Sequence, residues 1–73
     1  MIKDHLVAKQ ISDLMLDYSR QLDRSIAMVQ RECDDEDFKT YRLATAKVLA
    51  EIYLEVLMPL YREHPDLKPE GMN

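Results

Sequence analysis

The sequence predicts an all-α protein, an antiparallel helical hairpin that dimerises into a four-helix bundle. Three observations lead to this fold. Apolar residues recur at steps of three and four along two long segments, and the only glycine is Gly71. The chain has 73 residues, too few to bury a large core without support. Apolar residues make up 47% and charged residues 33%, a balance typical of helix bundles and not of disordered chains.

The first predicted helix covers residues 3–33. Its apolar residues form one row with a repeat of eleven residues, a period close to that of a straight α-helix. The opposite side is charged, and no glycine or proline interrupts the segment. The row that we expect to pack inside the hairpin is Val7, Ile11, Met15, Tyr18, Leu22, Ile26, Val29 and Cys33.

A turn at residues 34–36 is predicted by a change of phase. A helix that continued past Cys33 would place charged residues on its apolar side, whereas the apolar row restarts out of phase at Phe38. Asp34 or Asp35 can cap the next helix, and the remaining acids lie at the positive end of its dipole. A calcium loop is the alternative, but the segment lacks the glycine and the spaced ligands of an EF-hand.

The second predicted helix covers residues 36–64, and a short tail covers residues 65–73. One apolar row again repeats every eleven residues. Pro59 lies inside the pattern, where the missing N–H predicts a kink, and Pro65 ends the helix. The row that we expect to face the first helix is Phe38, Tyr41, Thr45, Leu49, Ile52, Val56 and Leu60.

The short connection makes the two helices antiparallel neighbours within a single domain, residues 1–73. Each helix is about 42–46 Å long at the usual rise per residue. Counting outward from the turn pairs residues whose numbers add to about 70. This register places Tyr18 level with Ile52.

A second apolar row on the second helix has no partner within the hairpin. A strip of this length on a small protein marks an interface. Two hairpins related by a two-fold axis would cover it and close a four-helix bundle; burial in a different protein is the alternative. The predicted dimer interface is Leu43, Ala46, Ala50, Leu54 and Leu57.

Three side chains near the predicted kink, Tyr53, Met58 and Tyr61, are the candidates for binding a partner protein. They are chosen because we expect these three side chains to be exposed near Pro59.

His5 and His64 are the only histidines, and the register places both at the same end of the hairpin. Together with a neighbouring carboxylate they are candidate ligands for zinc or another divalent metal. Two solvated histidines at helix ends are the simpler interpretation. No metal or other cofactor is therefore assigned to the chain.

No catalytic residues are predicted. The chain has no glycine-rich phosphate loop, no Ser-His-Asp set and no cysteine pair. Cys33, the single cysteine, is interpreted as a small buried residue. The expected function is a non-enzymatic interaction or regulatory module whose partners are a second copy of itself and another protein.

The net charge of −4 argues against a general nucleic-acid binder, and no membrane is expected as a partner because the chain has no apolar run of about 20 residues. The alternative function is a nucleic-acid-binding regulator that uses the basic residues of the half nearest the turn. These are Arg20, Arg24, Arg31, Lys39 and Arg42. The absence of a signal-like segment and of a long apolar run, together with a single cysteine, leads us to expect a cytoplasmic protein.

Overall fold

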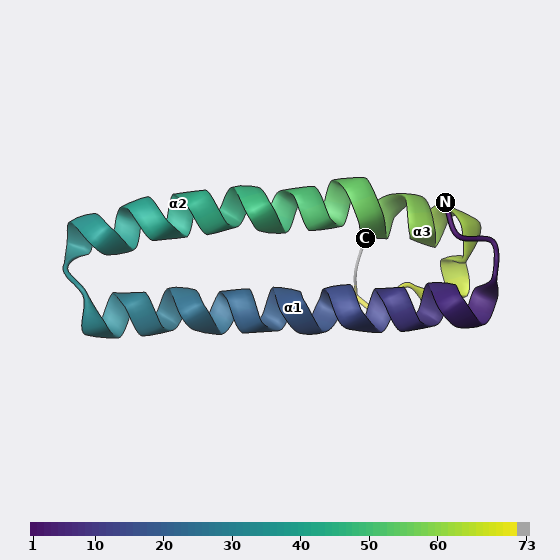
Figure 1. Cartoon of the computed structure of the whole chain (residues 1–73), viewed down its shortest axis with the longest axis horizontal. Coiled ribbons are helices and arrows are strands. Elements are labelled where there is room, and N and C mark those ends of the chain that lie inside the picture. Colours follow the sequence, from purple (N-terminus) through teal and green to yellow (C-terminus); the bar gives the residue numbers. More distant parts are fainter. Residues whose placement is uncertain (72–73) are drawn as a thin grey trace.

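Two long antiparallel helices form the body of the protein in the computed structural model, which describes residues 1–71 (Figure 1). α1 is His5–Glu32 and α2 is Asp35–Glu51. No strand occurs in this described part of the chain, and the longest dimension is 45 Å. The predicted all-α hairpin and its length are confirmed. The last two residues of the predicted tail, 72 and 73, lie outside the described residues.

An aspartate caps the N-terminus of each long helix. Asp4 Oδ1 accepts a hydrogen bond from the Val7 N–H at 3.0 Å, and Asp34 Oδ1 accepts one from the Asp37 N–H at 2.8 Å. Each cap satisfies an N–H group that has no partner within the helix. The predicted break is therefore present, and it occupies only Cys33 and Asp34.

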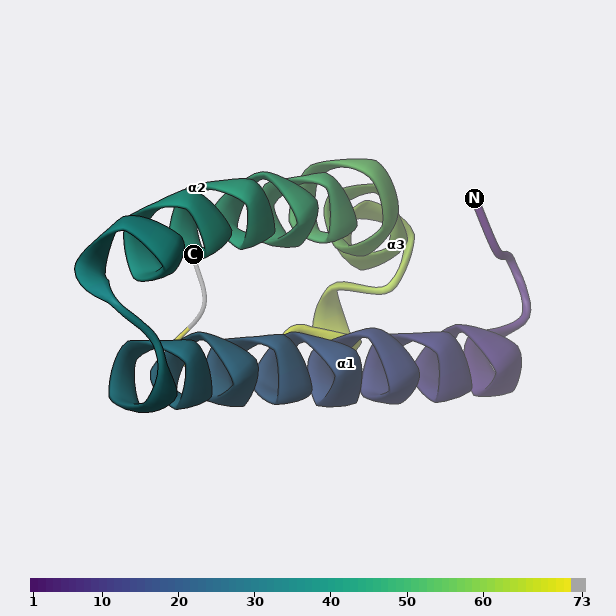
Figure 2. The ribbon, with the colours of Figure 1, turned by 60° about the vertical axis from the view of Figure 1, so that its left-hand side comes forward.

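The α-helix widens into a π-helical turn before Pro59. A π-helical turn, Ile52–Leu57, follows α2 and leads into α3, Met58–Glu63. The Met58 N–H donates to the Tyr53 carbonyl, five residues back. Proline has no N–H and crowds the carbonyl of the preceding turn, so a wider turn at this point relieves the conflict. Figure 2 shows the result, with α2 running across the view and α3 seen nearly end-on.

The row predicted to face the first helix from the second is confirmed. None of its seven members is classed as exposed, from Phe38 at the turn to Leu60 in α3. Thr45 and Leu60 are buried, and the others are half-buried. The three- and four-residue steps of the sequence therefore identified the inner side of α2 correctly.

The predicted inner row of α1 is confirmed in part, since five of its eight members are half-buried: Ile11, Met15, Leu22, Ile26 and Val29. Val7, Tyr18 and Cys33 are exposed, and Tyr18 retains 49% of its accessible surface. The covered side also includes small residues, and part of it follows a seven-residue repeat. The members of this repeat are Ala8, Ser12, Met15, Ser19, Leu22, Ile26 and Val29, and Ile11 and Ser25 are half-buried beside them.

Two serine hydroxyls on the covered side of α1 bond to tyrosines across the hairpin. Ser12 Oγ lies 2.6 Å from the Tyr61 hydroxyl, and Ser25 Oγ lies 2.6 Å from the Tyr41 hydroxyl. The paired residue numbers add to 73 and to 66, on either side of the expected 70. Small side chains with satisfied hydroxyls allow the helices to approach closely at no desolvation penalty.

The core is small and lies at the end of the hairpin away from the turn. Its buried apolar side chains are Ala8, Leu57, Leu60 and Tyr61. Three of the four belong to the π turn and α3, so this end is the best packed part of the chain. None of the helices within residues 1–71 combines the length and apolar character that a membrane crossing needs.

Candidate functional site

The two histidines meet at the well-packed end, as the register predicts. The ring centroids of His5 and His64 are 5.4 Å apart, and the rings are edge to face. His5 Nε2 lies 2.7 Å from Asp66 Oδ2, and the buried His64 donates from Nε2 to the carbonyl of Ile2 at 2.7 Å. Each Nε2 thus has a protein partner, and residues 1–71 contain no group of three metal-ligating side chains. These two contacts hold the N-terminal segment against the chain at the end of α3.

Two carboxylates at this end have lowered pKa values. The hydrogen bond with His5 holds the pKa of Asp66 below its ordinary value of 3.8. A contact with the N-terminal ammonium of Met1 holds the pKa of Glu63 below 4.5. A depressed pKa in the folded chain means that the contact stabilises the fold above the unfolded pKa. That contribution is lost as the pH falls through the folded pKa.

Removal of the His5 ring is expected to return the pKa of Asp66 towards 3.8, because the largest cause of its depression is then absent. We expect wild-type stability to decline as the pH falls below about 4, and to decline less in His5→Ala. The carboxyl carbon shift of Asp66, followed by NMR against pH, measures the change. Glu63 serves as the internal control, since its main partner is the N-terminus. Identical Asp66 titration curves in the wild type and in His5→Ala would contradict the assignment of His5 as the main cause of the lowered pKa.

A pocket of about 310 Å³ opens beside α3. It is lined by Tyr53, Met58, Tyr61, Arg62, Pro65 and Lys68. All three side chains proposed from the sequence as partner-binding residues therefore line one pocket, but Tyr61 is only 6% exposed, so the expectation that it is exposed is wrong. The volume is at the lower limit of pockets that bind small ligands or a few side chains of a partner.

The sequence analysis missed both basic residues of this pocket: it places Arg62 in the second helix without assigning it to a site, and it treats Lys68 as part of a tail. A 3₁₀ turn, Pro65–Leu67, follows α3, and the Lys68 N–H donates to the Pro65 carbonyl at 3.2 Å. The turn keeps Lys68 against α3. The available signal was Leu67, an isolated apolar residue among polar ones, which is half-buried in the structure.

Four members of the predicted dimer interface form an exposed row, which we call the α2 row: Leu43, Ala46, Ala50 and Leu54. Leu43 is 62% and Leu54 53% exposed, and both alanines are exposed. Leu57, the fifth member, is only 2% exposed and packs within the hairpin, so it does not belong to this surface. The π turn adds one residue before it and rotates it inward by about 100°.

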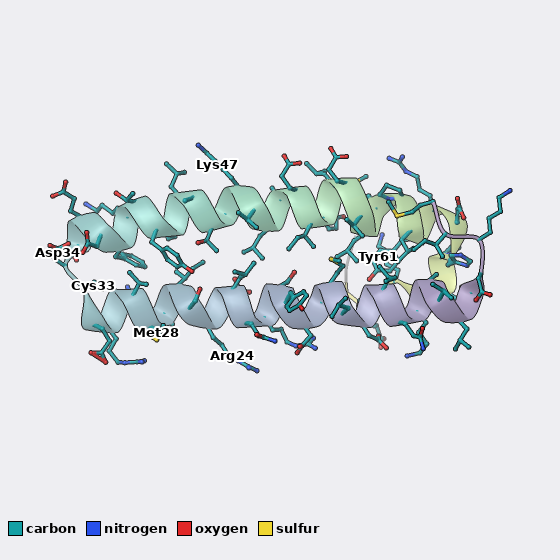
Figure 3. The ribbon with its side chains drawn as sticks, viewed as in Figure 1. Arg24, Met28, Cys33, Asp34, Lys47 and Tyr61 are labelled. Carbon is teal, nitrogen blue, oxygen red and sulfur yellow. The ribbon has the colours of Figure 1, made fainter. Side chains whose placement is uncertain are left out.

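α1 also exposes apolar side chains, which the sequence analysis did not expect. They are Leu6, Val7, Leu14, Tyr18 and Met28. Figure 3 shows Met28 directed away from α2. The protein is a single layer of two helices, so side chains on the outer sides of both helices face solvent.

The basic residues near the turn do not form one free cluster. A guanidinium nitrogen of Arg20 lies 3.8 Å from a carboxylate oxygen of Asp17. Arg31 Nε lies 3.4 Å from Glu32 Oε1. The Arg42 guanidinium stacks on Phe38, 5.6 Å from the ring centroid. Arg24 extends away from α2 into solvent (Figure 3). Exposed pairs of this kind belong to an ordinary mixed surface.

Two surfaces therefore stand out, the α2 row and the pocket beside α3. The first is apolar, and the second combines aromatic side chains with two cations. Comparison of the chain with protein-family models, with curated proteins and with solved structures gives no match.

Proposed function

We propose that this chain is a non-enzymatic interaction module that works as a homodimer. Two hairpins pack through the α2 row and form a four-helix bundle, whose outer surfaces are then available to another protein. The observation that carries the proposal is the exposure of Leu43 and Leu54 on a row with two alanines between them. Leucines at the ends of such a row supply apolar area, and alanines in the middle allow close approach of a second helix.

The accessible surface of the chain supports a second copy as the partner. It amounts to 5435 Å². A compact monomer of 8.6 kDa is expected to expose about 4700 Å². The excess of roughly 700 Å² is close to the roughly 800 Å² that each partner buries in a standard interface.

The small core gives a second argument. Leu60 is the one large side chain that is fully buried among the described residues. A chain of this size without a disulfide gains stability most readily by association. Most oligomers of small proteins are symmetric dimers, in which a self-complementary row covers itself. The lone exposed cysteine, Cys33, is compatible with the reducing cytoplasm that we propose as its compartment.

Light scattering behind a sizing column tests the proposal. We expect the wild type to have twice the chain mass of 8.6 kDa. Leu43→Glu with Leu54→Glu places four carboxylates in the symmetric interface and is expected to raise the dimer Kd at least about 100-fold. The double variant should keep its helical circular dichroism.

The matched control is Leu6→Glu with Leu14→Glu, which changes two exposed leucines of α1. We expect this control to stay dimeric. A monomeric wild type would refute the homodimer. Dissociation of the α1 control alone would refute packing through α2.

A further inference from the structure

The pocket beside α3 has an unusual charge for this chain. Arg62 and Lys68 are two of its six lining residues, and none of the six is acidic. The whole chain carries a net charge of −4. A cationic rim on apolar walls complements a group that presents carboxylates next to apolar surface.

The opposite end of the hairpin carries such a group. Asp35 and Glu36 form the exposed first turn of α2, next to the capping residue Asp34. In Figure 1 the turn and α3 lie at opposite ends of the molecule, so these acids cannot reach the pocket of their own chain. A second copy that lies antiparallel can bring them there.

We propose that two copies pack antiparallel along α2, and that Asp35 and Glu36 of each copy bind at the pocket of the other through Arg62 and Lys68. This inference rests on the proposed homodimer and specifies its orientation and register. It closes two identical contacts around one two-fold axis, as an isologous dimer requires.

The spacing of residues along the chain supports this register. A two-fold axis at the middle of the α2 row sets Leu43 opposite Leu54 of the second copy. Glu36 lies seven residues before Leu43, and Arg62 lies eight residues after Leu54, one of which is the extra residue of the π turn. Each step therefore amounts to about seven regular residues, or about 10 Å along a helix. The register that covers the row therefore also brings Glu36, with its neighbour Asp35, level with Arg62 of the second copy.

The π turn brings Arg62 onto the correct side. In a regular helix, eight residues would rotate Arg62 by about 80° from Leu54. The extra residue in the π turn leaves the phase of seven residues, which is close to two full turns. Arg62 therefore continues the α2 row towards the pocket.

Charges in the middle of α2 favour the same orientation. Lys47 points away from α1 (Figure 3), and Glu51 is exposed one turn later. The antiparallel register sets Lys47 of each copy beside Glu51 of the other. Parallel packing would instead place Asp35 against Asp35 and Arg62 against Arg62, which is repulsive.

A charge exchange tests the inference. The pocket variant is Arg62→Glu with Lys68→Glu, and the turn variant is Asp35→Lys with Glu36→Lys. Alone, each variant would set like charges against each other at both contacts, and we expect its dimer Kd to rise about 100-fold. An equimolar mixture should recover the dimer, because the heterodimer has opposite charges at both contacts. Sedimentation equilibrium measures the dimer Kd of the pocket variant, of the turn variant and of their mixture.

Two controls keep the result interpretable. Lys9→Glu with Arg24→Glu makes the same change in net charge on α1 and should leave the dimer Kd unchanged. Asp35→Asn with Glu36→Gln removes the acids without placing cations at the start of α2, and it is used if the lysine variant loses helical signal. We expect this neutral variant to raise the dimer Kd about tenfold.

The outcomes separate this inference from the homodimer on which it rests. A monomeric wild type refutes both. A dimeric wild type whose pocket and turn variants keep the wild-type Kd refutes only the antiparallel contact. Loss of the dimer in the pocket variant alone, or failure of the mixture to recover it, shows that another group occupies the pocket and overturns the inference.

Discussion

Leu60→Ala is expected to lower the free energy of unfolding by about 2–5 kcal/mol, enough to unfold much of a small domain. Leu60 is 0% exposed and is the one large side chain fully buried among residues 1–71. It lies in α3, one residue after Pro59, where the helix cannot easily shift to fill a cavity. The lost transfer energy and the cavity therefore both contribute.

Urea denaturation followed by circular dichroism measures this effect, at a protein concentration that is the same for every variant because association contributes to stability. Leu6→Ala is the matched control, since Leu6 is 66% exposed and also helical. We expect the control to change stability by less than about 0.5 kcal/mol. Equal midpoints for the two variants would show that α3 is not part of the core.

Tyr61→Phe is expected to lower the free energy of unfolding by about 1–3 kcal/mol, although it removes only one oxygen. The Tyr61 hydroxyl is the partner of Ser12 Oγ at 2.6 Å, and Ser12 is 2% exposed. No buried side-chain polar atom among the described residues lacks a partner. The substitution would leave one hydroxyl without its cross-helix bond.

A double-mutant cycle separates the bond from the loss of packing. Ser12→Ala added to Tyr61→Phe should restore part of the stability, because both polar groups are then absent. Tyr18→Phe is the control, since Tyr18 lies half in solvent. Additive effects of the two substitutions would mean that the hydroxyl pair does not determine which side of α1 faces α2.

The sequence by itself determined the helices, their ends and the inner side of α2. These features depend on local physics. The cap at Asp34 uses an N–H group three residues away, and a break in apolar phase is visible wherever it occurs. The cap at Asp4 was not predicted, because the first helix was expected to begin at residue 3. Pro59 likewise predicted a kink in the second helix, although only the structure showed that a π turn forms there.

The tertiary structure decided the limits of the covered side of α1. Five of the eight residues that the sequence analysis placed inside are half-buried, but Val7, Tyr18 and Cys33 are exposed. The observed side includes Ser12 and Ser25, whose hydroxyls meet tyrosines 49 and 16 residues away. A pattern of hydrophobicity counts serine as polar and cannot anticipate a partner so distant in the chain.

The candidate site likewise combines residues that the sequence analysis identified with residues that only the structure revealed. Tyr53, Met58 and Tyr61 were identified from the sequence because they flank a proline on an apolar helix. Arg62 follows Tyr61 in α3, whereas Lys68 joined them only when the chain folded back after Pro65. Leu57 is buried and does not belong to the exposed row, because the extra residue in the π turn directs it inward. Local hydrogen bonding can be deduced from neighbouring residues, whereas the alignment of distant segments is set by packing in three dimensions.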